Sequence, residues 1–147
     1  MDLRLSTLCA VAVMPFLFHA AAATAAKTEI KGAAILDNPC GKASVKQMGL
    51  VHAGNMEEAN KLTTKEMQDQ WKAMPAKDRT MMTGMMKDMS QTEQQYAADI
   101  KANGVLVVDG SAATLTVKKT VKDKNGSSTT TTTQNFKVDG NQCMITR

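Results

Sequence analysis

The chain has 147 residues, of which 43% are hydrophobic, 3% aromatic and 22% charged, with a formal net charge of +4. Its lysines are spread along the chain, and Lys118, Lys119 and Lys124 have no aromatic neighbours that could stack on bases. This pattern argues against nucleic-acid binding and indicates a solvated, mildly basic surface.

The first 26 residues have the order of a secretory signal peptide. A short segment with Arg4 precedes an apolar run over 5–18, and the alanine-rich residues 20–26 offer several A-x-A cleavage sites. The apolar run is shorter than the roughly 18 residues that a membrane span needs, although an N-terminal membrane anchor is the alternative. We expect cleavage near residues 23–26, a periplasmic or secreted protein without an integral membrane segment, and one domain over 27–147.

Two cysteines, Cys40 and Cys143, remain once the signal peptide is removed. An even number of cysteines in an exported protein favours one structural disulfide. Free thiols or a metal site are the alternatives. The chain has no C-x-x-C motif and no histidine near either cysteine in sequence, so the spacing supports neither redox nor zinc chemistry.

The first half of the mature chain has a helical pattern. Residues 37–41 form a turn cluster that we expect to begin no regular element. A short helix is predicted over 44–52, and two more begin at the capping residues Asn55 and Thr63. Pro75 separates the third helix from a fourth, which carries a run of methionines.

The second half is typical of an antiparallel meander. We expect residues 97–108 to be mostly extended, with a bulge or bend at 103–104. Apolar side chains alternate with polar ones over 113–117 and predict a half-buried strand. The threonines at 129–133 favour a strand but offer little apolar surface, so we expect an exposed edge. A short final strand points Cys143 inward, and the whole predicts an α+β domain.

Residues 81–89 read MMTGMMKDM, with five methionines in nine positions. At about 100° per residue these methionines span an arc of roughly 140° on a helix, close to the width of a face that packs on a core. Because Met fills irregular cores well, a core face is the preferred interpretation. The alternatives are an adaptable binding surface and a Cu(I) or Ag(I) site with Met81, Met85 and His52 as candidate ligands.

Catalytic chemistry has little support in the sequence. The acid–base candidates are His52, Tyr96 and Asp99, with Tyr96 expected at the helix-to-sheet junction and Asp99 in the first strand. No nucleophile motif, phosphate-binding loop or carboxylate pair with a histidine is present. We therefore expect a protein that is not an enzyme and needs no cofactor.

Three phrases in the chain carry a resemblance to a known family: HAGNMEEANKL at 52–62, VDGSAATLTVKK at 108–119 and NFKVDGNQCMIT at 135–146. In this order they resemble small, uncharacterised, lumazine-binding-like exported bacterial members of the nuclear transport factor 2-like superfamily. The last phrase departs from the family pattern, which has a Trp after the turn where this chain has Gln142 and Cys143. A cysteine there fits a disulfide that replaces part of the aromatic packing.

The resemblance implies N-terminal helices packed on a curved antiparallel sheet, a cystatin-like or nuclear transport factor 2-like cone with a pocket between the two layers. It implies no activity. The preferred function is a non-enzymatic binding module for a small apolar ligand or a peptide. The alternative is a protein-interaction module, such as a periplasmic inhibitor or immunity factor, whose threonine edge receives a partner strand. The candidate binding residues are Met67, Trp71, Met82, Met86 and Tyr96.

Overall fold

The computed structural model describes residues 26–124 and 126–147. Apart from Ala26, the expected signal peptide and its cleavage region lie outside these residues, as does Asn125 in a predicted turn. In the described part of the chain, no helix combines the length and the apolarity that a membrane crossing requires.

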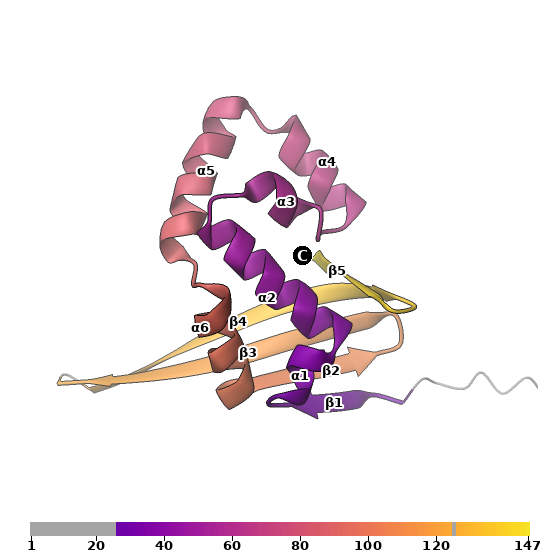
Figure 1. Cartoon of the computed structure of the whole chain (residues 1–147), viewed down its shortest axis with the longest axis vertical. Helices are drawn as coiled ribbons and strands as arrows, with labels where there is room; N and C mark the ends of the chain where they lie inside the picture. Colours follow the sequence, from indigo (N-terminus) through magenta and orange to yellow (C-terminus); the bar gives the residue numbers. More distant parts are fainter. Residues whose placement is uncertain (1–25, 125) are drawn as a thin grey trace, which may run out of the picture.

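Five strands of the described chain form one antiparallel sheet in the order β1-β2-β3-β4-β5. Each strand pairs with the next, and within this sheet β1 and β5 are the two edges, so the sheet is open (Figure 1). The mixed α+β class and the meander are confirmed, whereas the cone of the resembled superfamily stays a prediction. The strands are β1 (Thr28–Lys31), β2 (Gly104–Asp109), β3 (Ala112–Asp123), β4 (Gly126–Asp139) and β5 (Gln142–Thr146).

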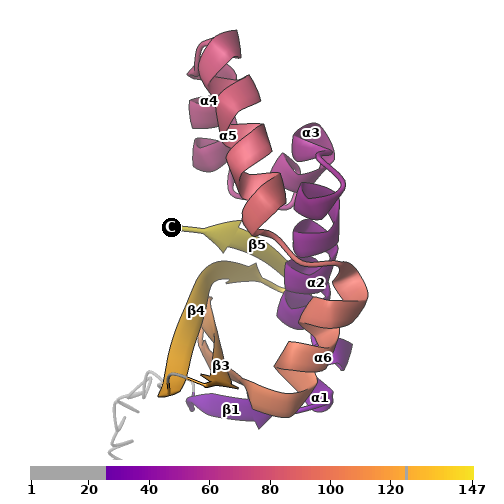
Figure 2. The same cartoon turned by 90° about the vertical axis from the view of Figure 1, so that its left-hand side faces the viewer.

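The helices of the described chain all lie between β1 and β2 in sequence. Helices α1, α2 and α6 cover one face of the sheet, whereas α4 and α5 extend beyond its β5 side (Figures 1 and 2). We call residues 65–89 the α4–α5 arm. The helices are α1 (Ala34–Asp37), α2 (Pro39–His52), α3 (Met56–Asn60), α4 (Lys65–Ala73), α5 (Ala76–Met89) and α6 (Glu93–Asn103).

The covered face of the sheet carries the core. Leu106 pairs with Leu115, and Ala113 pairs with Phe136, which in turn pairs with Ile145. All five are buried, which confirms the alternation predicted for β3 and the inward face of β5. Each fully buried Leu, Ile or Phe side chain contributes about 1.5–3 kcal/mol to folding. The helices add Ile35, Cys40, Tyr96 and Ile100 to this core.

Helix α6 replaces the extended structure that the sequence predicted over 97–108, so that prediction is wrong before Gly104. The side chain of Thr92 accepts a hydrogen bond from the Gln95 backbone N–H, and the Gln95 side chain accepts one from the Thr92 N–H. This reciprocal capping box fixes the helix start. Tyr96 and Ile100, one turn apart, are then buried against the sheet.

The dipeptide Asn103-Gly104 is the junction between α6 and β2 and not a bulge in a strand. A Cβ atom on Gly104 would lie 2.5 Å from the backbone oxygen of Ile100. Glycine therefore lets the strand leave the end of the helix at close range.

Helix α2 begins at Pro39, so the prediction that residues 37–41 begin no regular element is wrong. Asn38 Oδ1 accepts a hydrogen bond of 2.9 Å from the Cys40 backbone N–H. Pro39 sits in the first helical turn, where a backbone N–H has no partner within the helix. The turn cluster is thus a helix cap, which extends the predicted helix by about one turn.

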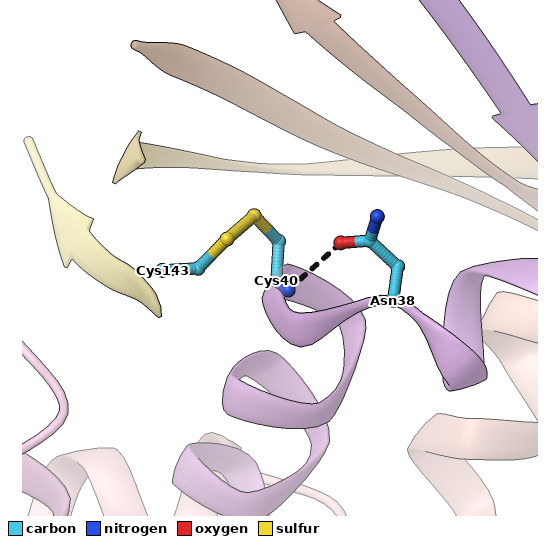
Figure 3. The surroundings of a disulfide bond; sticks show 3 residues. All are labelled: Asn38, Cys40 and Cys143. Atoms are coloured by element: carbon cyan, nitrogen blue, oxygen red, sulfur yellow. Dashed lines mark hydrogen bonds between the residues drawn. A yellow bond between two sulfur atoms is a disulfide. The ribbon is translucent and has the colours of Figure 1, made fainter. Parts of the chain in front are cut away.

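The predicted disulfide is present and joins Cys40, in the first turn of α2, to Cys143 in β5 (Figure 3). The two Cα atoms are 4.9 Å apart and the residues are 103 positions apart in sequence. Closing a loop of this length stabilises a fold by about 4–5 kcal/mol on the chain-entropy estimate. The bond ties the first long helix to the last strand.

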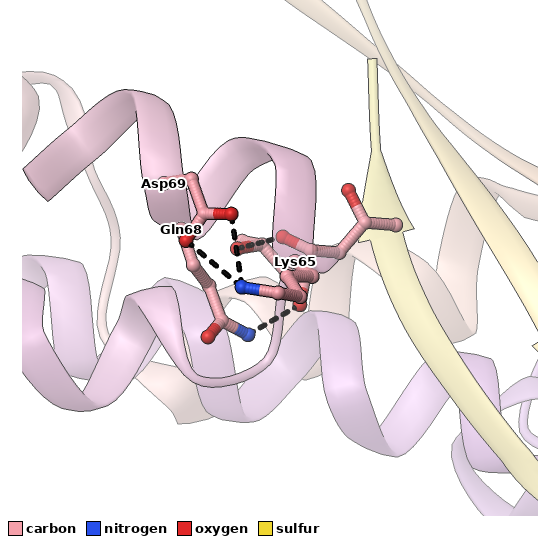
Figure 4. A network of polar contacts seen from close by, with 5 residues as sticks. Lys65, Gln68 and Asp69 are labelled. Carbon is pink, nitrogen blue, oxygen red and sulfur yellow. Dashed lines mark hydrogen bonds and ion pairs between the residues drawn. The ribbon is translucent and has the colours of Figure 1, made fainter. Parts of the chain in front are cut away.

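Helix α4 is anchored by side-chain contacts at its start (Figure 4). Gln68 Nε2 donates to the Thr63 carbonyl oxygen at 2.9 Å, and Lys65 Nζ lies 3.0 Å from Asp69 Oδ2. The N-cap is Thr64, one residue after the predicted one, while Thr63 is buried. Because the ion pair is exposed it contributes little, and the bond to Thr63 is the more important anchor.

The threonine run in β4 is an exposed edge, as predicted. Residues 129–133 pair with 116–120 of β3, whereas β5 pairs only with 135–139 of β4. All five threonine side chains are exposed. Among the described strands, none covers the outer edge of this part of β4.

Candidate functional site

A cavity of about 170 Å³ lies between α2, α3 and the α4–α5 arm. Its wall is mainly apolar, because five methionines line it together with Trp71, Val51 and Ala59. Polar groups come from Gln47, Asn60, Thr63, Gln70 and Arg147. The methionines are Met56, Met67, Met74, Met82 and Met86.

Four of the five predicted binding residues meet in this cavity. Met67 and Trp71 lie one turn apart on α4, and Met82 and Met86 lie one turn apart on α5, so each helix presents a pair to the shared space. Tyr96 does not join them. It lies in α6 against the sheet and, together with Asp99, lines a pocket between α2, α6 and the strands β3 and β4.

The position of the cavity differs from the pocket that the resemblance implies. The core fills much of the space between the helices and the sheet, where Leu115 and Phe136 are at most 1% exposed. A pocket of about 220 Å³ also lies between these two layers, lined from α2, α6, β3 and β4. The cavity lies among the helices instead, and of its lining residues only Arg147, which follows β5, comes from the sheet side. The arm therefore adds a cavity that is separate from the pocket between the helices and the sheet.

A second cavity of about 260 Å³ adjoins the first along α2 and α5. Gln47, Val51 and Met86 line both cavities, and Met48 and Met89 line the second. Together the two cavities are lined by seven methionines: Met48, Met56, Met67, Met74, Met82, Met86 and Met89. We call the two adjoining cavities the methionine groove.

The methionines of α5 do not form a core face, so the preferred interpretation of this run is wrong. Met81, Met85 and Met89 are 61%, 58% and 82% exposed, and Met82 and Met86 are 37% exposed each. No residue of α5 is buried. The arm extends away from the sheet, so only one side of α5 faces other helices. The geometry thus favours the adaptable binding surface among the interpretations of the sequence.

Trp71 is the largest side chain in the groove wall. It is 9% exposed, and its Nε1 donates a hydrogen bond of 3.4 Å to Glu57 Oε1 on α3. This bond satisfies the polar end of the indole while the ring contributes apolar surface. Trp71 is the one tryptophan of the chain. It also lines a second pocket with Glu57 and Arg79, so its fluorescence reports on both pockets, and the variants of the groove wall assign a signal to one of them.

A chain of buried polar contacts connects the core to the groove. Ser44 Oγ lies 3.4 Å from Tyr96 Oη and also donates to Gln134 Oε1 on β4. Gln134 Nε2 donates to Gln47 Oε1 at 2.7 Å. Burial raises the pKa of Tyr96 by more than the contact with Ser44 lowers it, so the phenol stays protonated and structural.

Asp99 lies in α6 and not in the first strand, contrary to the prediction. Its Oδ2 accepts hydrogen bonds of 3.0 Å from both Gln91 Nε2 and Lys119 Nζ. Burial alone would raise the pKa of Asp99, but these hydrogen bonds and the positive charge of Lys119 outweigh it and lower the pKa. A carboxylate held in its ionised form this way serves an ion pair between α6 and β3.

The candidate metal ligands Met81, Met85 and His52 are not brought together in either cavity. Met81 and Met85 are exposed, and His52 ends α2 with Nδ1 3.4 Å from Ser90 Oγ. Among the described residues, no group of three or more His, Cys, Asp and Glu side chains is placed to hold a metal ion.

Comparisons with known proteins identify no family. No family model matches the chain, and neither a curated protein nor a solved structure matches it. The resemblance to the nuclear transport factor 2-like superfamily therefore stays a prediction, and the function has to be inferred from the geometry of the groove.

Sequence reasoning missed several residues of the groove. Met48 has helical spacing with Val45 and Val51, and this signal alone does not separate a core position from a cavity wall. Arg147 gives no local signal at all. It reaches the groove because β5 pairs with the connection between α3 and α4, which is a long-range contact.

Proposed function

We propose that the protein is an exported, non-enzymatic binding module that holds a small apolar ligand in the methionine groove. The observation that carries the proposal is the convergence of seven methionines on two adjoining cavities, six from four helices and Met74 from the end of α4. Met side chains are flexible and polarizable, so such a wall adapts to the shape of its ligand. The signal-peptide pattern and the disulfide agree with export.

The size of the groove limits the affinity. Burying about eight methylene groups yields about 6 kcal/mol. This free energy corresponds to a dissociation constant of tens of micromolar, and restraining the ligand weakens it further. We therefore expect Kd values of tens of micromolar or weaker for a simple apolar ligand.

Titration of the disulfide-bonded protein with 1-decanol, followed by Trp71 fluorescence, tests the proposal. In one variant Met82→Gln and Met86→Gln make the groove wall polar at nearly constant side-chain length and helix propensity. The matched control carries Met81→Gln and Met85→Gln, with the same spacing on the same helix but outside the groove.

We expect the groove variant to raise the Kd for decanol about tenfold or more, because each polar group placed in the wall loses hydration without gaining a partner. The control should stay within about twofold of the wild type. A fluorescence signal that does not respond to decanol, or equal losses in both variants, would refute the proposal.

A second candidate function is protein interaction through the threonine edge. Its basis is the uncovered outer edge of β4 at residues 129–133, which could receive a partner strand. Charged side chains disfavour such pairing, so Thr129→Lys with Thr133→Lys should release a partner that co-purifies in fixed stoichiometry. Native mass spectrometry of the protein recovered from the periplasm checks this, and a bare monomer contradicts the interaction.

A further inference from the structure

Charge is distributed very unevenly around the methionine groove. Among the described residues that line the two cavities, Arg147 alone is charged, and no acidic side chain lines either one. Within the described chain, Arg147 forms no ion pair with an acidic side chain. Two carboxylates lie in adjoining pockets: Glu57, which accepts from Trp71, and Asp99, in the pocket that shares Met48 and Met89 with the groove. Among the described residues, the one charged side chain that lines the groove itself is therefore positive.

The backbone holds Arg147 at this place. The Ile145 N–H donates to the Leu62 carbonyl and the Thr64 N–H donates to the Ile145 carbonyl, both at 2.9 Å. These bonds attach the end of β5 to the connection between α3 and α4, two residues before Arg147. The backbone thus holds Arg147, an exposed residue, at the wall of the groove.

A neighbouring amide adds hydrogen-bond donors. Gln47 Oε1 already accepts from Gln134. Its NH₂ group is therefore left to offer to a ligand. Together with the guanidinium of Arg147, this part of the groove wall provides hydrogen-bond donors, which favour a ligand that carries hydrogen-bond acceptors.

We infer that the ligand of the groove is a medium-chain fatty acid, with its carboxylate at Arg147 and its hydrocarbon chain along the methionines. This inference rests on the proposed function, because it names the ligand class of the same site. Each cavity is smaller than the roughly 300–1,000 Å³ of sites for drug-sized molecules, so a single slim chain fits better than a fused ring system. A carboxylate accepts from guanidinium and amide donors at once, whereas an ammonium group would be repelled.

A matched series of ligands with one chain length tests the inference: decanoate, 1-decanol and decylamine, each titrated against Trp71 fluorescence at pH 7.4. We expect decanoate to bind about tenfold or more tightly than decanol, since charge-assisted hydrogen bonds are roughly twice as strong as neutral ones. Decylamine should bind more weakly than decanol.

Two arginine variants test which positive charge binds the carboxylate of decanoate. Arg147→Gln should bring the affinity for decanoate to that for decanol. Arg79→Gln is the control, because it makes the same charge change on α5 and lines a different pocket. It should keep the preference for decanoate. Circular dichroism verifies that both variants are folded.

The outcomes separate the two proposals. Equal affinities for the three ligands, or an equal loss of the decanoate preference in both arginine variants, overturn the fatty-acid inference and leave apolar binding intact. If none of the three ligands changes the fluorescence of Trp71, apolar binding itself is refuted and the inference falls with it.

Discussion

Gln134 on β4 donates a hydrogen bond of 2.7 Å to Gln47 on α2, and this pair joins the sheet to the wall of the methionine groove. The same Gln134 accepts from the hydroxyl of Ser44, which is 1% exposed. Gln134 is thus the one strand residue in a polar chain that otherwise belongs to α2 and α6. Leu115, which pairs with Gln134 on β3, is apolar and offers no side-chain partner, so the amide forms its hydrogen bonds with Ser44 and Gln47.

Replacing Gln134 by Leu should destabilise the protein by about 1–3 kcal/mol, because the buried Ser44 hydroxyl loses its acceptor. The free energy of unfolding in urea measures the effect. Gln142→Leu on β5 is the control, since Gln142 is exposed and such surface changes usually stay within about 0.5 kcal/mol. Equal effects of the two substitutions would show that the polar chain does not stabilise the fold.

The disulfide should contribute more to the free energy of unfolding than the hydrogen bonds of Gln134. Replacing Cys40 and Cys143 together by Ser should lower the free energy of unfolding by up to about 4–5 kcal/mol, because the unfolded chain regains the freedom of a long loop. Urea unfolding of the oxidised and the dithiothreitol-reduced wild type should differ by a similar amount. A wild type whose unfolding curve is unchanged by reduction contradicts this prediction.

The features that the sequence predicted correctly are those with a local or a counting signal. Alternation of apolar residues identified the inner face of β3, because the side-chain period of a strand is 2. The two cysteines outside the predicted signal peptide predicted the disulfide between Cys40 and Cys143. The spacing of Met67 and Trp71, and of Met82 and Met86, placed each pair on one helix face, and both pairs line the groove.

The predictions that are wrong concern features that depend on long-range packing or on helix caps. Thr92 and Gln95 form a capping box that marks the start of α6, yet the residues after it were assigned to a strand. The methionine run has the period of a core face, but periodicity does not say what covers that face. Here α5 belongs to an arm that extends away from the sheet, so Met81 and Met85 face solvent.

Two glycines should respond in opposite directions to the same substitution. A Cβ on Gly41 in α2 would lie 1.9 Å from the backbone oxygen of Ile35, so Gly41→Ala requires a shift of α1 against α2. A Cβ on Gly84 in α5 would meet nothing within 4 Å. Because Ala is favoured over Gly inside a helix, Gly84→Ala should stabilise the protein by about 0.5–1 kcal/mol.

Thermal unfolding of the two variants checks this prediction. Gly41→Ala should lower the melting temperature by several degrees, and Gly84→Ala should raise it slightly. A tolerated Gly41→Ala would contradict the close packing of α1 on α2.

The ion pair between Asp99 and Lys119 predicts a loss of stability in acid. The folded pKa of Asp99 is lowered from its ordinary value of 3.8. This stabilisation is therefore complete above about pH 4–5 and is lost as the pH falls through the folded pKa. Between pH 7 and pH 2.5, the free energy of unfolding in urea should fall less for Asp99→Asn than for the wild type. It should also fall less for Lys119→Gln, because this substitution removes the charge that lowers the pKa of Asp99.

The α4–α5 arm should be the part of the described chain that opens most easily. No residue of α5 is buried, whereas β3 carries Ala113, Leu115 and Val117 in the core. Local opening costs little where few apolar side chains leave a buried environment, so amide hydrogens exchange faster there. Hydrogen exchange followed by mass spectrometry should therefore show faster exchange over 76–89 than over 113–117.

Ligand binding should then slow exchange in the arm selectively. A molecule held in the methionine groove contacts α4 and α5 together with α2, and it stabilises the closed arm by the free energy of binding. Saturating decanoate should reduce exchange over 65–89, with little change over 113–117. Equal protection of the arm and the sheet in the free protein would contradict the open character of α5. Slower exchange in the sheet alone would place the ligand against a surface other than the groove.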